Sequence, residues 1–223
     1  MGILSEFNDE TDNATLVLKN TEIYNSEVFG LWAKSSHITA ANCVFGNAGQ
    51  SVFYGNMGGN YTFRHCTFAN YWDWSFRDKP AVWIDNYQPI ESGNAYSYPL
   101  EQALFDNCII SGDHPIELLL DPLEATDFQF QFNNSLLQYD NPTGVSAYNP
   151  LYSFDNSSLY KDVVINGFPD FKAPNYFDFR IGINSEAIGK GNITTSNLVP
   201  FDITGTARNN TPDMGAYQHV KFD

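Results

Sequence analysis

The sequence Ile38-Thr39-Ala40-Ala41-Asn42-Cys43-Val44-Phe45 decides how this chain folds. Its second half runs from a polar residue through a small residue to an apolar end. Blocks with a similar ending begin at Leu16, Tyr61, Ala103 and Phe130, so the first two steps are 22 and 23 residues and the third is 42. A fixed period of roughly 20 to 50 residues is the signature of a stacked repeat architecture.

Each repeat contains two short apolar stretches separated by turn residues. In the first repeat, residues 16–23 are followed by a turn at Asn25 and Ser26 and by a second apolar stretch at 29–33. Such stretches are too short, and their connections too tight, for helices. The five blocks predict an all-β solenoid of about five coils, in which successive coils pair about 4.8 Å apart and equivalent residues stack.

One polar position recurs at a corner of every coil. An asparagine at such a corner tolerates the bend and hydrogen-bonds the neighbouring backbone. The histidine in this series is therefore expected to replace an asparagine rather than to act in catalysis. The predicted corner residues are Asn20, Asn42, His65, Asn107 and Asn134.

The three cysteines of the chain follow three of these corner residues. Cys43, Cys66 and Cys108 share the position that Thr21 and Ser135 take in the other blocks. We expect a column of small, buried, reduced thiols, because free cysteine packs like a small apolar residue. No His or Cys falls at zinc-ligand spacing, so no zinc site is predicted.

Charge and composition exclude several classes of partner. The net charge is −15, which opposes binding to nucleic acid or to anionic lipid. No stretch approaches the run of about 18 apolar residues that a membrane span requires. The first residues lack a signal peptide, and no capping segment precedes the ladder at Leu16, so we favour a secreted or surface protein whose chain is shortened over a cytoplasmic one.

The repeat divides the chain into three parts. Residues 1–15 are predicted to form an acidic entry segment, residues 16–162 the coils, and residues 163–223 a C-terminal closing segment. Two insertions, 69–80 and 87–100, enlarge both turns of the third coil and flank one strand. Insertions within a repeat commonly map to the functional face.

The second strands of the coils predict one inward and one outward column, because neighbouring residues on a strand face opposite sides. A shift of one residue in the register would exchange the two columns. The predicted inward column is Leu31, Phe53, Trp83 and Leu118, and the outward column is Trp32, Tyr54, Ile84 and Leu119.

The outward column makes a candidate binding face. Trp32 and Tyr54 offer rings on which a sugar can stack, and polar residues two positions further on can bind its hydroxyl groups. The alternative is that a loop covers this stripe. The polar residues are Lys34, Asn56, Asn86 and Asp121.

The first insertion holds the densest chemistry of the chain. Trp72 and Trp74 are candidate glycan-binding residues. In an enzyme, Asp73 and Asp78 are the candidates for general acid and base or for Ca²⁺ ligands.

Arg77 and Lys79 would serve an elimination from a uronate, as the neutralising cation and the base. We favour the alternative that the aromatics pin the loop while its charges pair with each other. His114 lies between Asp113 and Glu117, but no Ser or Cys nucleophile accompanies it, so we expect no catalysis there.

The end of the chain carries a closing motif. Asp202-Ile203-Thr204-Gly205-Thr206-Ala207-Arg208 is followed by Pro212-Asp213-Met214-Gly215-Ala216-Tyr217. This motif resembles the terminal signature of right-handed parallel β-helix repeat proteins secreted or displayed by Bacteroidetes-type bacteria. The resemblance implies a pectate-lyase-like fold, an extracellular or cell-surface location and association with glycans. Asp202, Arg208 and Asp213 are expected to form a buried polar latch at the C-terminal end of the solenoid.

Three functions remain open on the sequence. We favour a surface module that binds a glycan or another surface protein without catalysis and without a cofactor. The alternatives are part of a polysaccharide lyase or glycoside hydrolase, with its site in the third coil or in further N-terminal coils, and a structural stalk or adhesin repeat.

Overall fold

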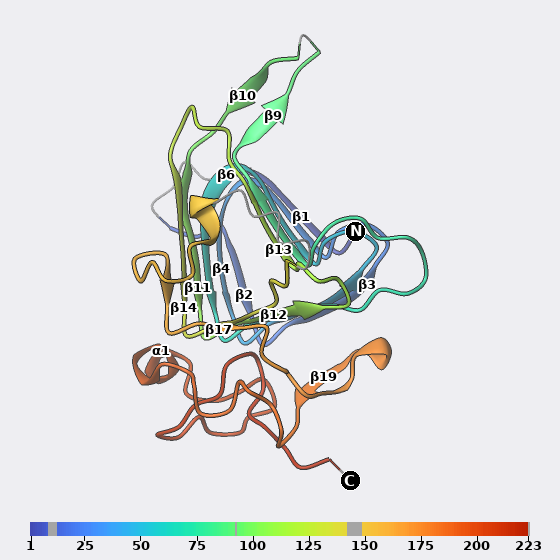
Figure 1. Ribbon diagram of the computed structural model, residues 1–223, viewed down its shortest axis with the longest axis vertical. Helices are drawn as coiled ribbons and strands as arrows, with labels where there is room; N and C mark the ends of the chain where they lie inside the picture. The colour runs from blue at the N-terminus through green and yellow to red at the C-terminus, as the bar shows by residue number, and fades with distance from the viewer. Residues whose placement is uncertain (9–12, 92, 142–148, 223) are drawn as a thin grey trace.

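The computed structural model describes residues 1–8, 13–91, 93–141 and 149–222, and almost all of its regular structure is β (Figure 1). Two parallel sheets enclose one core, so the all-β prediction is confirmed. Two antiparallel hairpins, two 3₁₀ turns and one short helix, α1 (Ile193–Leu198), complete the described part of the chain. No helix there is long and apolar enough to cross a membrane.

The larger sheet contains nine strands in the order β1-β4-β6-β11-β14-β16, with β2 beside β4, β8 beside β6 and β13 beside β8. All of its pairs are parallel. Its strands are β1 (Ile3–Asn8), β2 (Leu16–Lys19), β4 (Leu31–Ala41), β6 (Phe53–Arg64), β8 (Val82–Asp85), β11 (Leu100–Asp106), β13 (Leu118–Asp121), β14 (Phe128–Asn133) and β16 (Tyr160–Lys161).

The smaller parallel sheet runs in the order β17-β15-β12-β7-β5-β3. Its strands are β3 (Glu22–Ser26), β5 (Val44–Ala48), β7 (Thr67–Asn70), β12 (Ile109–Gly112), β15 (Leu136–Leu137) and β17 (Val164–Ile165).

The long strands β4 and β6 bend sharply, so the larger sheet forms two walls. The bends lie at Ser35 and at Met57 to Gly59, where the backbone adopts positive φ. We call β2, β11, β14, β16 and the second halves of β4 and β6 the first wall. The smaller sheet is the second wall, and β1, β8, β13 and the first halves of β4 and β6 are the third. Figure 1 shows the three walls around the core.

The ladder register on the first wall agrees with the sequence prediction. Leu16 pairs with Ile38, Ile38 with Tyr61, Tyr61 with Ala103, and Ala103 with Phe130. The 42-residue step is therefore a single rung with long insertions. All five predicted corner residues have φ between 44° and 55°, the left-handed conformation that asparagine tolerates.

The cysteine column is also confirmed. Cys43, Cys66 and Cys108 are all free and fully buried. They lie in the main core beside stacked phenylalanines such as Phe63 and Phe105.

The third-wall register of the third coil is one residue away from the prediction. Val82, rather than Trp83, pairs with Phe53 and Leu118, and it is fully buried. Trp83 therefore belongs to the outer column, and Ile84 points inward. The insertion before this strand hid its start, and one residue of error exchanges the two faces.

The two ends of the ladder extend beyond the prediction. Within the predicted acidic entry segment, β1 pairs with β4, while residues 9–12 of that segment lie outside the described residues. At the other end, β16 and β17 continue the register of β14 and β15. Asp162 between them has φ of 53° and occupies the corner position, so the repeat does not stop at 163.

The closing segment lies along the side of the second wall rather than over the end of the stack. The outer side of this wall carries apolar residues such as Val44 and Ile109, which Phe179 and Met214 cover. Because the outer side of the second wall is apolar, the closing segment packs there and covers it. The segment contains the hairpin of β18 (Phe171–Ala173) and β19 (Asp178–Ile181), joined by η2 (Pro174–Tyr176).

The predicted latch residues are buried at the joint between this segment and the corner. Arg208 donates a hydrogen bond to Asn42 Oδ1 (3.0 Å) and others to backbone carbonyls of its own segment. Asp202 and Asp213 accept hydrogen bonds from backbone N–H groups of the segment. The latch therefore lies at the side of the stack.

Candidate functional site

The first insertion was predicted over residues 69–80; β7 includes residues 69 and 70, and the remaining loop, residues 71–80, is held down by one buried ion pair. Arg77 is only 4% exposed, and its guanidinium donates hydrogen bonds to both carboxylate oxygens of Glu117, at 2.9 and 2.7 Å. It also pairs with Asp113. We call this segment the anchored loop; it is the teal loop at the right of Figure 1.

Glu117 is the centre of the anchor. Its carboxylate also accepts hydrogen bonds from the backbone N–H groups of Ala81 (2.6 Å) and His114 (2.8 Å). Burial raises the pKa of this carboxyl, and the hydrogen bonds from Arg77 oppose the increase. A buried pair with its remaining lone pairs satisfied fixes geometry, so the loop is pinned at its base.

The outer part of the anchored loop presents aromatic rings to solvent. Trp74 is 65% exposed and Phe76 is 84% exposed. Trp72 supports Trp74 at 5.2 Å between ring centroids, and its Nε1 donates a hydrogen bond to Ser75 Oγ (2.8 Å). Exposed aromatic side chains on a fixed loop are the usual anchors of recognition surfaces.

Beside this loop, three rings stack on the outer side of the third wall. Tyr54 lies between Trp32 and Trp83, at centroid distances of 5.9 and 4.0 Å with planes 15° apart. Lys79 of the anchored loop lies 4.9 Å from the Trp83 ring and joins the loop to this aromatic column. Lys34 lies over Trp32 at 4.1 Å.

The three rings of the aromatic column bury much of their surface against one another. Tyr54 is buried between the two indoles, and the ring of Phe29 also packs against Trp32 and Tyr54, at 5.1 and 5.0 Å between centroids. The indole Nε1 atoms of Trp32 and Trp83 are both buried and have no hydrogen-bond partner in the described part of the chain.

A buried carboxylate organises the polar row next to the column. Asp85 accepts hydrogen bonds from Tyr54 Oη (2.7 Å), Asn56 Nδ2 (2.8 Å) and the Met57 backbone N–H (2.9 Å). Burial raises its pKa, and these hydrogen bonds oppose the increase. Asp121 occupies the facing position on β13 and accepts a hydrogen bond from Tyr87 Oη (2.8 Å).

The structure therefore brings together some predicted site residues and separates others. Trp32, Tyr54, Asn56 and Asp121 lie on one face, and Trp72 and Trp74 lie on the adjoining loop. Asn86 does not join them, because it is fully buried and holds the turn at Leu123 and Thr126. Asp85 takes the place predicted for Asn86.

The residues predicted for catalysis in the anchored loop differ in how exposed they are and in what they pair with. Arg77 is committed to its ion pair, whereas Asp73 and Asp78 are exposed, and Asp78 lies 3.6 Å from Lys79. In the part of the chain that is described, no three His, Cys, Asp or Glu side chains are grouped to hold a metal ion.

Sequence reasoning missed Asp85, Trp83 and the role of Glu117. The first two follow from the correct register, which the alternation from Val82 to Asp85 would support. The Arg77–Glu117 pair joins residues 40 positions apart, and no local pattern predicts it.

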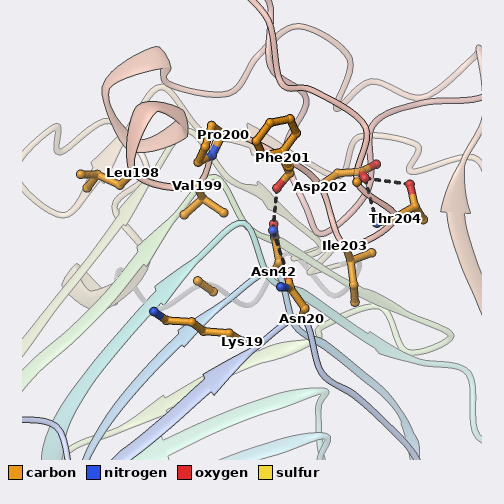
Figure 2. Close-up of a pocket in the computed structure, with 12 residues that line it drawn as sticks. Lys19, Asn20, Asn42, Leu198, Val199, Pro200, Phe201, Asp202, Ile203 and Thr204 are labelled. Carbon is orange, nitrogen blue, oxygen red and sulfur yellow. Dashed lines mark hydrogen bonds between the residues drawn. The ribbon is translucent and has the colours of Figure 1, made fainter.

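A separate cavity of about 520 Å³ lies where the closing segment meets the corner (Figure 2). Asn42 Nδ2 donates to Asn20 Oδ1 (3.2 Å) and to the Phe201 carbonyl (2.6 Å). Asp202 beside it accepts from the backbone N–H and the hydroxyl of Thr204. These polar groups hold the segment in place, so we assign this cavity to the joint and not to the site.

Comparison of the chain with models of known protein families gives no match, and no curated protein matches it.

Proposed function

We propose that the protein is a right-handed parallel β-helix, secreted or displayed at a bacterial surface, that binds a glycan at the anchored loop and the aromatic column. Three walls, left-handed corner residues and rungs in register support the β-helix. The closing motif supports membership in the secreted or surface-displayed parallel β-helix repeat proteins and a location outside the cell. The acidic net charge favours a neutral glycan over a polyanionic one.

The observation that carries the proposal is the exposed Trp74 on a pinned base. Leaving a large ring in water is unfavourable unless a partner covers it. The Arg77–Glu117 pair removes much of the loop's freedom before binding, so little ordering entropy is lost when a sugar stacks on the ring. Lys79 over the Trp83 ring and Asp121 beside Asp85 are the charged groups of the adjoining column that can bind hydroxyl groups.

Affinity electrophoresis in gels containing single polysaccharides tests this function. We expect at least one neutral polysaccharide to retard the protein, and Trp74→Ala or Phe76→Ala to reduce the retardation. Tyr96→Ala is the matched control, because Tyr96 is 61% exposed on the hairpin of β9 (Tyr87–Pro89) and β10 (Ala95–Ser97), at a different corner of the molecule. Retardation that survives both Trp74→Ala and Trp32→Ala would contradict the proposed face.

Catalysis by a lyase or hydrolase is the second candidate, and one observation favours it. Asp85 and Asp121 face each other on neighbouring strands, and a buried carboxyl with a raised pKa suits a general acid. Release of unsaturated or reducing-end sugars from the same polysaccharides, abolished in Asp85→Asn, would establish it. Binding without product supports the binding module. If no polysaccharide binds, the glycan-binding proposal is replaced by one of the two remaining functions, binding of a protein partner or a structural stalk.

A further inference from the structure

The cavity at the joint between the closing segment and the ladder is separate from the anchored loop and the aromatic column. Its volume of about 520 Å³ lies within the range of small-ligand sites, about 300 to 1,000 Å³. One side of the cavity is the corner of the first two rungs, at Asn20 and Asn42, and the other side is the turn of residues 198–205 (Figure 2).

A small residue on the second rung makes room for the cavity. The outward position before the corner belongs, on five successive first-wall rungs in register, to Lys19, Ala41, Arg64, Asp106 and Asn133. Ala41 is the one short side chain in this series, and it lines the cavity. The turn of residues 198–205 therefore covers a hollow at this rung rather than a long side chain.

The first corner residue has a free hydrogen-bond donor at the cavity. The next four corner residues each hydrogen-bond the closing segment, in the pairs Asn42 with the Phe201 carbonyl (2.6 Å), His65 with Ser196 Oγ (2.8 Å), Asn107 with the Asn192 carbonyl (3.0 Å) and Asn134 with the Lys190 carbonyl (3.0 Å). Asn20 Oδ1 accepts a hydrogen bond from Asn42, but Asn20 Nδ2 has no partner among the described residues. Because Asn20 is exposed, a ligand oxygen can reach this donor and take the place of the missing contact.

The charge beside Asn20 favours an anionic oxygen. Lys19 lines the cavity, is exposed, and forms no ion pair in the part of the chain that is described. The carboxylate of Asp202 also lines the cavity, but it is held by hydrogen bonds from the backbone N–H groups of Thr204, Thr206 and Gln218. Carboxylates further away are screened beyond about 8 Å at physiological salt, so Lys19 decides the local preference.

The turn of residues 198–205 gives the cavity an apolar side. Val199 and Ile203 line it, and Leu198 and Phe201 beside them are 68% and 56% exposed. The hydrogen bonds to Asp202 hold this turn in shape without a ligand. A preformed site of this kind loses little ordering entropy on binding.

We propose that this cavity binds a small organic acid with an apolar body, such as an aromatic monocarboxylate. One carboxylate oxygen accepts a hydrogen bond from Asn20 Nδ2, and the other pairs with Lys19 Nζ. The apolar body rests on Val199, Phe201 and Ile203. The proposal does not depend on the glycan-binding function, because the two sites share no residue.

Titration of ¹⁵N-labelled protein with single acids tests the proposal. Phenylacetate, indole-3-acetate and octanoate would each be added up to about 10 mM. We expect at least one acid to shift the side-chain amide signals of Asn20 and the backbone signals of residues 198–205. The alcohol and the amine with the same apolar body should bind at least about tenfold more weakly, because they lack the carboxylate.

Four variants separate the parts of the site. Asn20→Asp keeps an acceptor for Asn42 and tolerates the φ of 48°, but it replaces the donor by a negative charge and should abolish detectable binding. Lys19→Met should weaken binding about tenfold. Ala41→Gln fills the hollow with a neutral side chain of a length that the neighbouring rungs carry, so it should weaken binding without lowering the thermal midpoint. Lys161→Met is the matched control, because Lys161 lies in the same column on a distant rung and should not affect binding.

Four results would each overturn the proposal. They are the absence of shifts with all three acids, equal binding of the alcohol, a loss in Lys161→Met as large as that in Lys19→Met, and unchanged affinity in Asn20→Asp. Inorganic phosphate is the remaining probe, and it should bind more weakly than the best acid. Phosphate binding as tight as that of the acids would show that the apolar side contributes nothing, which also contradicts the proposal.

Discussion

Replacement of Glu117 by glutamine should be among the most destabilising single changes at the anchored loop. Arg77 would keep its positive charge in a site that is 4% exposed, with Asp113 as its remaining counterion. The side chain of Asp113 is 45% exposed, so water screens that interaction. Removing one partner of a buried pair costs about 3 to 5 kcal/mol, and because Asp113 remains we expect about 3 kcal/mol for Glu117→Gln.

Urea unfolding followed by tryptophan fluorescence measures this cost, with a slope that stays at the wild-type value if the transition remains two-state. Asp113→Asn is the matched control, and its exposed pair should contribute less than about 1 kcal/mol. Arg77→Met with Glu117→Gln removes both charges and should recover part of the lost stability. A smaller cost for Glu117→Gln than for Asp113→Asn, or a double variant no more stable than Glu117→Gln, would contradict the role of Glu117 as the buried counterion of Arg77.

Three further outcomes are expected. Burial, and then the positive charge of the neighbouring Arg208, hold the pKa of His65 well below 6.5 in the folded protein. The unfolded chain therefore binds a proton on this residue more readily than the folded protein does. The free energy of unfolding should be constant above pH 6.5 and fall by up to about 1.4 kcal/mol per pH unit below it. His65→Asn should remove this part of the pH dependence of urea unfolding. Asn42→Ala puts alanine at φ of 52°, a left-handed conformation that asparagine tolerates better than alanine, and it removes the hydrogen bonds to Phe201 and Arg208. It should therefore cost about 2 kcal/mol or more, measured the same way. Burial raises the pKa of the Cys66 thiol, so native protein should react with a thiol reagent only at the rate of unfolding.

The sequence predicts those features that a local pattern determines. The corner asparagines locate each rung, because few other residues accept positive φ, and the first-wall register follows from them. The register of β8 does not follow from the corner residues, since a 12-residue insertion separates it from the nearest of them, and only the short alternation from Val82 to Asp85 indicates it. The sequence does not predict that the closing segment docks on the outer side of the second wall, because Val44 and Ile109 face outward there but look like core residues in the sequence.

The candidate site shows the same division. Trp32, Tyr54 and Trp74 can be predicted from the sequence, because outward aromatic residues stand out among polar neighbours. Asp85 and Glu117 act through partners on other rungs, and such partners become visible only when the rungs are stacked.

The side-on position of the closing segment has a mechanical consequence. It is bonded to five successive rungs, through Tyr217 to Glu22, Arg208 to Asn42, Ser196 to His65, Asn192 to Asn107 and Lys190 to Asn134. In a solenoid whose rungs touch only their neighbours, tension on the ends peels one rung at a time. A strap across five rungs shares the load among them, so this protein should resist pulling as a single unit and yield in one step.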